Sequence, residues 1–390
     1  MASQQGLFEE FPKTSKEEWA AQWIKDLKGK PLSELDWEVE ANITQFAAYT
    51  EEEIAPSPTL TAGRIANTWG VGEYIEVEDM GQANAAVLEG LEGGVNAPLF
   101  RLHHLPDLQE LAVLLEGVEP AFITVHFALQ HPDKDPAVLF RHLIYYARRR
   151  GLKLSDIKGS VDFDPLLDWA NPPFDALARI ITFADRHTPH FKVLQVNGQV
   201  LHDGVENTSR ELALILSKGV AYLEEMMQRG IEPAVTNGAM QFSLALSTSY
   251  FVEIAKIRAL KILWANVLTA YDLEEVVLPP IAAHTAPESQ TDNREYNMIQ
   301  AATQAMAAAT GGADYVYVLP ADAVRQEHSS SFSRRIARNV QHLLQMETHL
   351  DRVVDPAAGS YYIETLTRKL CEEAWHQFQE MEEKGGYMAL

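Results

Sequence analysis

Residues 121–163 read AFITVHFALQHPDKDPAVLFRHLIYYARRRGLKLSDIKGSVDF. Two runs rich in Val, Ile and Phe, Ala121–Phe127 and Ser155–Phe163, have the length and composition of buried strands. Between them, Ala137–Arg150 has the length and apolar spacing of a helix. A strand, a helix and a second strand in this order predict parallel strands joined by a crossover helix.

The same alternation extends in both directions from this stretch. Further strands are predicted at Glu73–Val77, Asn96–Leu102, Val193–Val196, Val235–Ser243, Val276–Ala283 and Tyr315–Leu319. Further helices are predicted at Gly81–Leu91, Asp107–Leu115, Phe174–Arg186, Ser209–Arg229, Tyr250–Ala270, Arg294–Thr310, Phe332–Glu347 and Ile363–Glu383. Eight strand–helix units in roughly 300 residues favour an α/β fold closed into a (β/α)₈ TIM barrel. An open, doubly wound sheet is the structural alternative.

The first 60 residues look different from the rest. Ser15 or Thr14 can cap a helix in which Trp19 and Trp23 recur at helical spacing, and the following run, 31–50, is short and irregular. We therefore expect an N-terminal helical arm over residues 1–60 and a barrel with a closing C-terminal helix over 61–390. The Trp face of the arm must be buried on its own barrel or on a partner chain.

Charge and composition limit the classes of partner. The chain has 55 Asp and Glu against 32 Lys and Arg, a formal net charge of −23. Such a surface repels phosphate backbones, so we expect no nucleic-acid partner, although a local basic pocket remains compatible with a phosphorylated small ligand. One cysteine, no secretory signal and no uncharged apolar run of membrane-spanning length predict a cytoplasmic protein with no membrane contact.

Most short catalytic motifs are missing from the sequence. It contains no Walker loop, no G-x-G-x-x-G after a strand, no C-x-x-C, no H-E-x-x-H and no G-x-S-x-G. His103 and His104 follow a strand, but adjacent histidines point in different directions and suit joint metal binding poorly. We therefore predict no metal site.

Polar residues that end apolar runs are better candidates for a site. Side chains just beyond the carboxyl ends of barrel strands line the mouth where barrel enzymes bind their substrates. The alternative is that such residues only satisfy loop backbone groups. The positions are Ser160, Asp162, Asn197, Gln199, Gln241, His284 and Thr285.

Several longer stretches resemble one known family. VVDPAAGSYYIETLTRKLCEEAW (353–375) is similar to its D-P-x-x-G-S-Y-Y-V-E segment, and FSRRIARNVQHLLQMET (332–348) to F-S-x-R-I-A-R-N-x-Q. TSYFVEIAKIRALKILW (248–264) and AMAAATGGADYVYVLPAD (305–322) match two further barrel segments. Together they resemble the barrel of the cobalamin-dependent methylmalonyl-CoA mutase family. The opening SKEEWAAQWIKDLKGKPLSELDW (15–37) is closest to the arm of the small (beta) subunits.

The resemblance implies a barrel whose axis admits the pantetheine arm of an acyl-CoA and whose mouth faces the corrin of adenosylcobalamin. Active members carry out a radical isomerisation of methylmalonyl-CoA and succinyl-CoA. They bind cobalamin through a separate C-terminal domain with the motif D-x-H-x-x-G. The nearest run here, 185–190, ends in His190 in place of Gly, and the sequence ends at Leu390. We therefore expect adenosylcobalamin to be bound by a domain absent here, and not by this chain alone.

The resemblance also implies that catalytic side chains have been replaced. The family's Tyr-His pair falls on Gln199 and Val200, and His202 lies two residues further on. Because Val200 cannot donate a hydrogen bond, the group that polarises the thioester carbonyl is missing. The family's Arg falls on Ala239, which cannot pair with a carboxylate.

The remaining family positions are also changed in this sequence. The family's Ser falls on Gln241, its Thr and Gln on Ser160 and Asp162, and a further Gln on His284. We therefore assign no catalytic residue and no metal ligand. The substrate-pocket candidates are Ser160, Asp162, Gln199, His202, Gln241 and His284.

Three functional hypotheses follow. The preferred one is a non-catalytic barrel that pairs with a catalytic mutase large subunit as a heterodimer, or self-associates. The second is an active acyl-CoA mutase of altered acyl specificity that uses a separate cobalamin-binding chain, with His202, His284 or Asp162 in the polar roles. The third is an acyl-CoA-binding module without chemistry.

Overall fold

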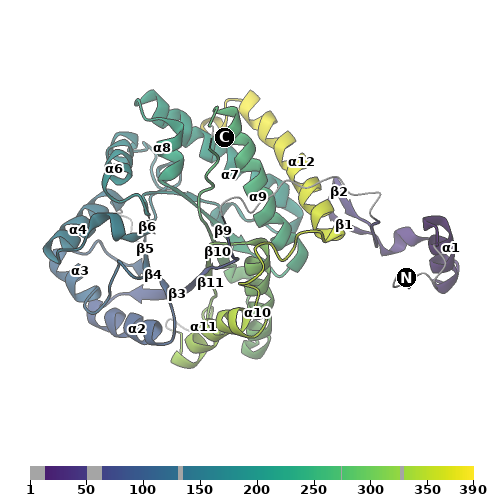
Figure 1. Ribbon diagram of the computed structural model, residues 1–390, viewed down its shortest axis with the longest axis horizontal. Helices are drawn as coiled ribbons and strands as arrows, with labels where there is room; N and C mark the ends of the chain where they lie inside the picture. The colour runs from purple at the N-terminus through teal and green to yellow at the C-terminus, as the bar shows by residue number, and fades with distance from the viewer. Residues whose placement is uncertain (1–13, 51–63, 131–134, 274, 326–328) are drawn as a thin grey trace, which may run out of the picture.

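The parallel barrel is the central element of the protein. The computed structural model describes residues 14–50, 64–130, 135–273, 275–325 and 329–390. Its main sheet has the order β7-β6-β5-β4-β3-β11-β10-β9-β8, and every neighbouring pair is parallel. The sheet curls into a ring with helices around the outside (Figure 1). The predicted (β/α)₈ architecture is confirmed, and the open sheet is excluded.

The strands and helices alternate along the chain as the sequence predicts. The strands are β3 (Gly70–Val77), β4 (Ala97–Leu102), β5 (Thr124–Leu129), β6 (Lys158–Val161), β7 (Phe191–Lys192), β8 (Leu194–Asn197), β9 (Met240–Leu246), β10 (Ile281–Thr285) and β11 (Tyr315–Tyr317). The helices between them are α2 (Met80–Glu92), α3 (Leu108–Leu114), α4 (Pro136–Arg149), α5 (Pro165–Asp168), α6 (Phe174–His187), α7 (Thr208–Gln228), α8 (Pro233–Gly238), α9 (Tyr250–Ala270) and α10 (Arg294–Gly311).

The ring closes through one divided strand. β7 pairs with β6, where Gly159 lies opposite Phe191, and β8 pairs with β9, where Leu194 lies opposite Met240. Only Val193 separates β7 from β8, so the two segments act as the fifth of eight strands. The predicted strand Val193–Val196 therefore begins two residues too late, because Phe191 and Lys192 already pair with the preceding strand.

Other predicted strands also need correction. The strand predicted at Val276–Ala283 begins only at Ile281, as β10. The first half of the strand predicted at Val235–Ser243 is helix α8, with Pro233 at its first position, and β9 begins at Met240. Proline suits the first turn of a helix, where its missing N–H has no partner to lose. The run at 31–50, predicted to be irregular, contains an antiparallel pair, β1 (Trp37–Glu40) and β2 (Ile43–Gln45).

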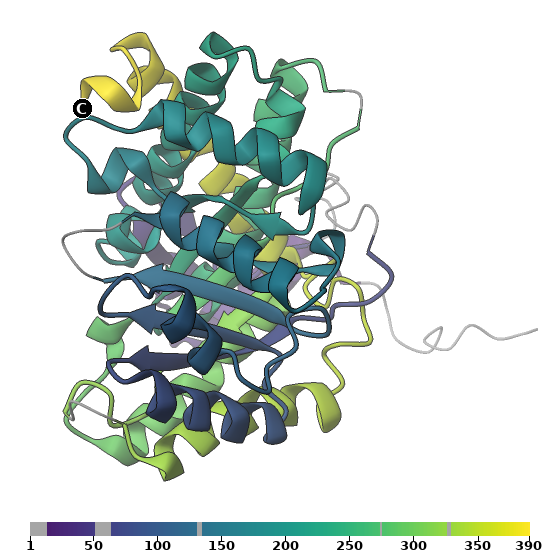
Figure 2. The same ribbon diagram turned by 90° about the vertical axis from the view of Figure 1, so that its left-hand side faces the viewer.

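A layer of apolar side chains lies between the strands and the outer helices. The rings of Phe100 on β4 and Phe127 on β5 stack with their centroids 5.3 Å apart, and both side chains are buried. Figure 2 shows the helices of the N-terminal half running along the outside of the strands. After β11, helices α11 (Ser331–Met346) and α12 (Tyr361–Glu383) cover the remaining surface, and α12 packs on α7 and α9.

The N-terminal arm extends away from the barrel (Figure 1). Helix α1 (Lys16–Asp26) is capped by Ser15, one of the two predicted residues, in a capping box with Glu18, but none of its residues is buried. The β1–β2 pair holds the arm to α12, because Lys369 donates to the carbonyl of Thr44. The arm boundary predicted at residue 60 lies outside the described residues.

A buried ion pair joins the barrel to helix α7. Asp164 accepts hydrogen bonds from the ammonium of Lys218 and the hydroxyl of Tyr222, and all three side chains are fully buried. The same carboxylate accepts the backbone N–H of Asn197 at 2.9 Å, so it also fixes the carboxyl end of β8. Removing either partner of such a pair strongly destabilises the fold, because the other partner is left as an uncompensated buried charge.

We expect Lys218→Met to destabilise the fold by about 3 to 5 kcal/mol, because it leaves Asp164 buried without its cation. The matched control is Lys30→Met, which removes an exposed i,i+4 pair with Glu34 and should cost less than about 1 kcal/mol. Urea unfolding followed by circular dichroism measures both. Similar losses in the two variants would show that the buried pair has no special role.

Candidate functional site

The interior of the barrel is filled by a cluster of aromatic rings, which we call the aromatic plug. It consists of Tyr74 on β3, His126 on β5, His284 on β10, and Tyr315 and Tyr317 on β11. The hydroxyl of Tyr74 lies 2.9 Å from Nδ1 of His284, and the ring of His284 stacks on Tyr317 with centroids 4.6 Å apart. His126 meets Tyr315 edge-on at 4.5 Å. The plug thus connects opposite sides of the ring of strands.

A polar layer continues from the plug toward β6, β8 and β9. The hydroxyl of Ser160 lies 2.7 Å from Nδ1 of His126. The amide of Gln241 donates to Ser160 at 3.4 Å and to the side-chain oxygen of Gln195 at 3.2 Å. All four side chains are buried. This network holds neutral groups only, so it needs no counter-ion inside the barrel.

Burial is the main cause of the pKa shifts in the plug. Loss of water contact lowers the pKa of His126 from 6.5 to about 3. The same effect, helped by the charge of Arg101, lowers the pKa of His284 to about 3. Burial, together with the nearby charge of Asp314, raises the pKa of Tyr315 to about 12. At neutral pH the plug is therefore uncharged, and its histidines are imidazoles.

Two glycines on β3 make room for the plug. A Cβ on Gly70 would lie 2.7 Å from the ring of Tyr315, and one on Gly72 would overlap the ring of Tyr317 and approach the carbonyl of Val316 to 2.5 Å. Since β3 and β11 pair with Gly70 opposite Tyr315 and Gly72 opposite Tyr317, each ring occupies the space that a side chain on β3 would take.

Chemically, this interior is a packed core. Tyr317 and His126 are each 1% exposed, and Ser160, Gln241 and His284 are 5% exposed or less. The packing differs from the open axis that the family resemblance implies. A nucleophile or base needs access to a reacting atom, and His126, Ser160 and His284 are buried with hydrogen-bonded ring or hydroxyl groups.

Three of the six predicted pocket residues come together in this interior. Ser160 and Gln241 bond each other, and His284 joins them through the plug. The prediction that Gln241 lies at the carboxyl end of its strand is wrong. β9 begins at Met240, so Gln241 is the second residue of the strand. Ala239, which precedes it, is buried at the end of α8.

The other three predicted residues lie outside the plug. Asp162 follows β6 and is half-buried, and Gln199 begins a short 3₁₀ turn after β8. The structure places His202 in a different buried cluster, with its Nδ1 2.9 Å from the carboxylate of Glu211. The ammonium of Lys256 lies 3.3 Å from the same carboxylate, so Glu211 contacts both His202 and Lys256.

Sequence reasoning missed most of the plug. His126, Tyr74, Tyr315 and Tyr317 are interior residues of strands that the sequence did predict. A signal was available: Tyr315 and Tyr317 alternate on one strand, and Gly70 and Gly72 alternate on another. Period-two spacing puts each pair on one face of its strand. Only the pairing of β3 with β11 shows that the glycines and the tyrosines face each other.

A cavity of about 480 Å³ opens at the carboxyl ends of β3 and β11, beside Tyr74. Arg101 covers the ring of Tyr74 at 4.2 Å and pairs with Glu76 at 3.0 Å. Glu78 and Asp79 add further negative charge to its wall. The cavity is at the end of the barrel where barrel enzymes bind their ligands. Arg101, which lines it, is already paired with Glu76.

The structure does not place the histidine of the nearest cobalt-ligating motif at the barrel mouth. His187, in the run nearest to the cobalt-ligating motif, ends α6 and packs on Phe183 with ring centroids 4.6 Å apart. It precedes β7, so it lies toward the amino ends of the strands, away from the mouth. Within the described part of the chain no three His, Cys, Asp or Glu side chains are grouped to hold a metal ion.

No described helix is both long and apolar enough to cross a bilayer.

Comparison with known proteins gives a consistent result. Residues 104–390 match the family model described as methylmalonyl-CoA mutase. The chain is 33% identical to a methylmalonyl-CoA mutase small subunit from Porphyromonas gingivalis, over 98% of this chain and 65% of that protein. It is 30% identical to the small subunit from Streptomyces virginiae, over 98% and 66%. A methylmalonyl-CoA mutase from Cereibacter sphaeroides is 26% identical over 94% and 58%. The chain thus spans about two thirds of its curated relatives or less.

Acidification should destabilise the fold through the plug. The pKa of each buried histidine is lower in the folded state than in the unfolded chain, so unfolding takes up protons. Their contribution is complete above about pH 6.5 and is lost as the pH falls toward 3. Between pH 7.5 and 5.5 the two histidines together should cost about 3 kcal/mol, measured by urea unfolding. The double variant His126→Gln/His284→Gln should lose much of this dependence, whereas the exposed control His104→Gln should retain it.

We expect Gly72→Ala to destabilise the barrel by about 1 to 3 kcal/mol, because the new Cβ overlaps the ring of Tyr317. Gly238→Ala is the control, since a Cβ there meets nothing within 4 Å. Thermal unfolding reports both. A Gly72→Ala variant as stable as the control would mean that the tyrosine rings are not fixed against β3.

Proposed function

This chain belongs to the methylmalonyl-CoA mutase family, and we propose that it is a non-catalytic barrel that pairs with a catalytic large subunit. In that pair the large subunit would bind adenosylcobalamin and isomerise methylmalonyl-CoA and succinyl-CoA. This chain would contribute a folded partner surface. The observation that carries the proposal is the aromatic plug, which fills the axis along which the family resemblance places the pantetheine arm.

The side chains at the family's catalytic positions support a non-catalytic role. Val200, at the position of the family's carbonyl-polarising histidine, is apolar and 55% exposed. The backbone N–H of its neighbour Gln199 donates to the side chain of Asn197 at 3.0 Å, which fixes the turn after β8. His202 could act on a substrate only by leaving Glu211, which it contacts at 2.9 Å inside the fold. Neither Val200 nor His202 thus offers the free donor that an oxyanion site requires.

The names of the relatives support the partner assignment. Proteins 33% and 30% identical over 98% of this chain are described as small subunits of the mutase. A small subunit implies a larger one in the same enzyme. The arm supports the same conclusion, because a helix with no buried residue gains stability when a partner covers its Trp19 and Trp23 face.

We also propose a cytoplasmic location, because a chain with a single cysteine suits a reducing compartment.

The direct test is co-expression with a catalytic mutase large subunit from the same source. We expect the two chains to co-purify, and turnover of methylmalonyl-CoA to require the large subunit and adenosylcobalamin. Gln199→Ala and Asp162→Asn in this chain should change turnover by less than about twofold, whereas loss of a catalytic acid or base costs about a hundredfold or more. A loss of that size from either variant would assign catalysis to this chain and reject the proposal.

Binding of acyl-CoA by this chain alone discriminates the other two hypotheses. We expect calorimetry with methylmalonyl-CoA or succinyl-CoA to show no saturable binding, because the plug occupies the axis. Saturable binding without reaction would favour the acyl-CoA-binding module. Turnover on adding adenosylcobalamin and a separate cobalamin-binding chain would favour the active mutase of altered acyl specificity.

A further inference from the structure

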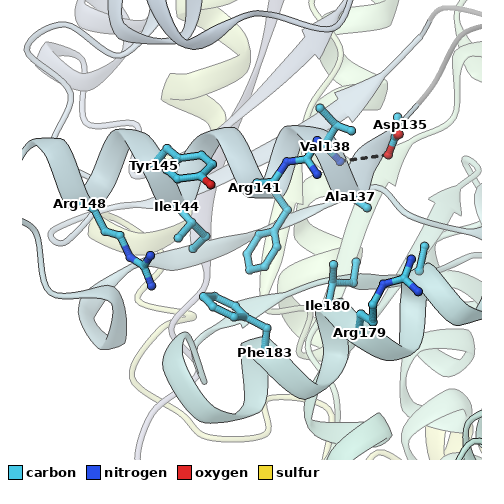
Figure 3. A pocket seen from close by; sticks show the side chains of 12 residues that line it. Asp135, Ala137, Val138, Arg141, Ile144, Tyr145, Arg148, Arg179, Ile180 and Phe183 are labelled. Atoms are coloured by element: carbon cyan, nitrogen blue, oxygen red, sulfur yellow. Dashed lines mark hydrogen bonds between the residues drawn. The ribbon is translucent and has the colours of Figure 1, made fainter.

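A groove of about 420 Å³ lies on the outside of the barrel between α4 and α6. Its floor is apolar: in Figure 3 the side chains of Ile144 on α4 and of Ile180 and Phe183 on α6 point into the space between the two helices. Three arginines line it, Arg141 and Arg148 on α4 and Arg179 on α6. We call this surface the arginine groove.

The cations of the groove have no internal partner among the described residues. No ion pair in that part of the chain uses Arg141, Arg148 or Arg179. The one carboxylate in the lining, Asp135, caps α4 by accepting the N–H of Val138 at 3.0 Å. The groove therefore presents guanidinium groups beside an apolar floor, free to bind carboxylates from outside.

This positive surface is unusual for the chain. The two helices that form the groove, α4 and α6, together with the capping Asp135, contain five Arg against three Asp, a net charge of +2, whereas the whole chain has a net charge of −23. The rest of the molecule must then carry −25. A second copy would therefore meet this side with a surface of opposite charge, which favours association between copies.

The chemistry of the groove suits a protein segment better than a small anion. A small-ligand site encloses most of its ligand and presents few, precisely placed polar groups. Here the arginines are exposed, and Tyr145 at the rim is 49% exposed. Exposed Arg and Tyr around an apolar centre are the residue types enriched at protein–protein contacts.

The arm carries a segment of complementary chemistry. Residues 31–40, PLSELDWEVE, contain four carboxylates and no Lys or Arg. Within it, Leu35 and Trp37 are 44% and 39% exposed, flanked by Glu34, Asp36 and Glu38. We call residues 34–38 the acidic strip. Among the described residues its only ion pair is the exposed one between Glu34 and Lys30.

Groove and strip cannot meet within one chain. Figure 1 places α4 and α6 on one side of the barrel and the arm on the opposite side. Their lengths nevertheless match. Arg141 and Arg148 are seven residues apart on a helix, about 10 Å, and Glu34 and Glu38 span about 12 Å through a 3₁₀ turn and a strand.

We propose that the arginine groove binds the acidic strip of a second copy of this chain. Leu35 and Trp37 would cover the apolar floor, and the strip carboxylates would pair with the arginines. The contact area is small and its ion pairs are exposed, so association should be weak and salt-dependent. This inference does not depend on the proposed partnership with a large subunit.

Sedimentation of the full chain across a range of concentrations tests the proposal. At 50 mM salt we expect self-association, weakened at least tenfold at 500 mM salt. The triple variant Arg141→Glu/Arg148→Glu/Arg179→Glu should weaken it at least tenfold at 50 mM salt. The control Arg149→Glu/Lys153→Glu/Arg186→Glu makes the same change in net charge with exposed residues that do not line the groove. It should weaken association less than threefold.

A charge exchange identifies the occupant. The strip variant Glu34→Lys/Asp36→Lys/Glu38→Lys should remain monomeric, as should the groove variant alone. Mixing the two should restore association to within threefold of wild type, because both contacts of the mixed pair again join opposite charges. A wild-type chain that stays monomeric at 50 mM salt and 100 μM would overturn the proposal. So would equal effects of groove and control variants, or a mixture that fails to associate.

Discussion

Closure of the parallel sheet is the constraint on which the rest of the structure depends. An open parallel sheet leaves two edges whose backbone groups need partners, and closure removes both. Here the last partners are supplied by residues 191–197, whose two segments bond β6 on one side and β9 on the other. Asp164 reinforces this junction, because it accepts the N–H of Asn197 while it pairs with Lys218 on α7.

Closure creates an interior that must be filled, and its contents separate a catalytic barrel from a structural one. In this chain two tyrosines on β11 occupy the space left by two glycines on β3, and two neutral histidines complete the plug. In the non-catalytic barrel proposed above, the same packing that fixes the core would leave no path for a substrate arm. Stability and loss of chemistry would then have one physical cause, which is dense packing of buried side chains along the axis.

Charge is divided between the inside and the outside of the molecule. Several buried charges are paired, as in Arg338 with Glu73 and Arg258 with Asp355. The cations of the arginine groove remain exposed on a chain that is otherwise strongly acidic. Under the proposed partner role, the groove and the arm are the surface features through which this chain would meet other chains.

The sequence by itself determined the order of strands and helices, because period-two and period-3.6 apolar patterns need no tertiary information. It placed the helices to within a few residues and predicted the barrel, and it named Ser160, Gln241 and His284 among the substrate-pocket candidates, which the structure brings together in the interior. It misplaced the start of β9, where Pro233 begins a helix. It also did not predict the contact between His202 and Glu211. Only the tertiary structure decided that Gly72 faces Tyr317 and that the axis is closed, because strand register brings together residues some 245 positions apart in the chain, and no local pattern encodes that distance.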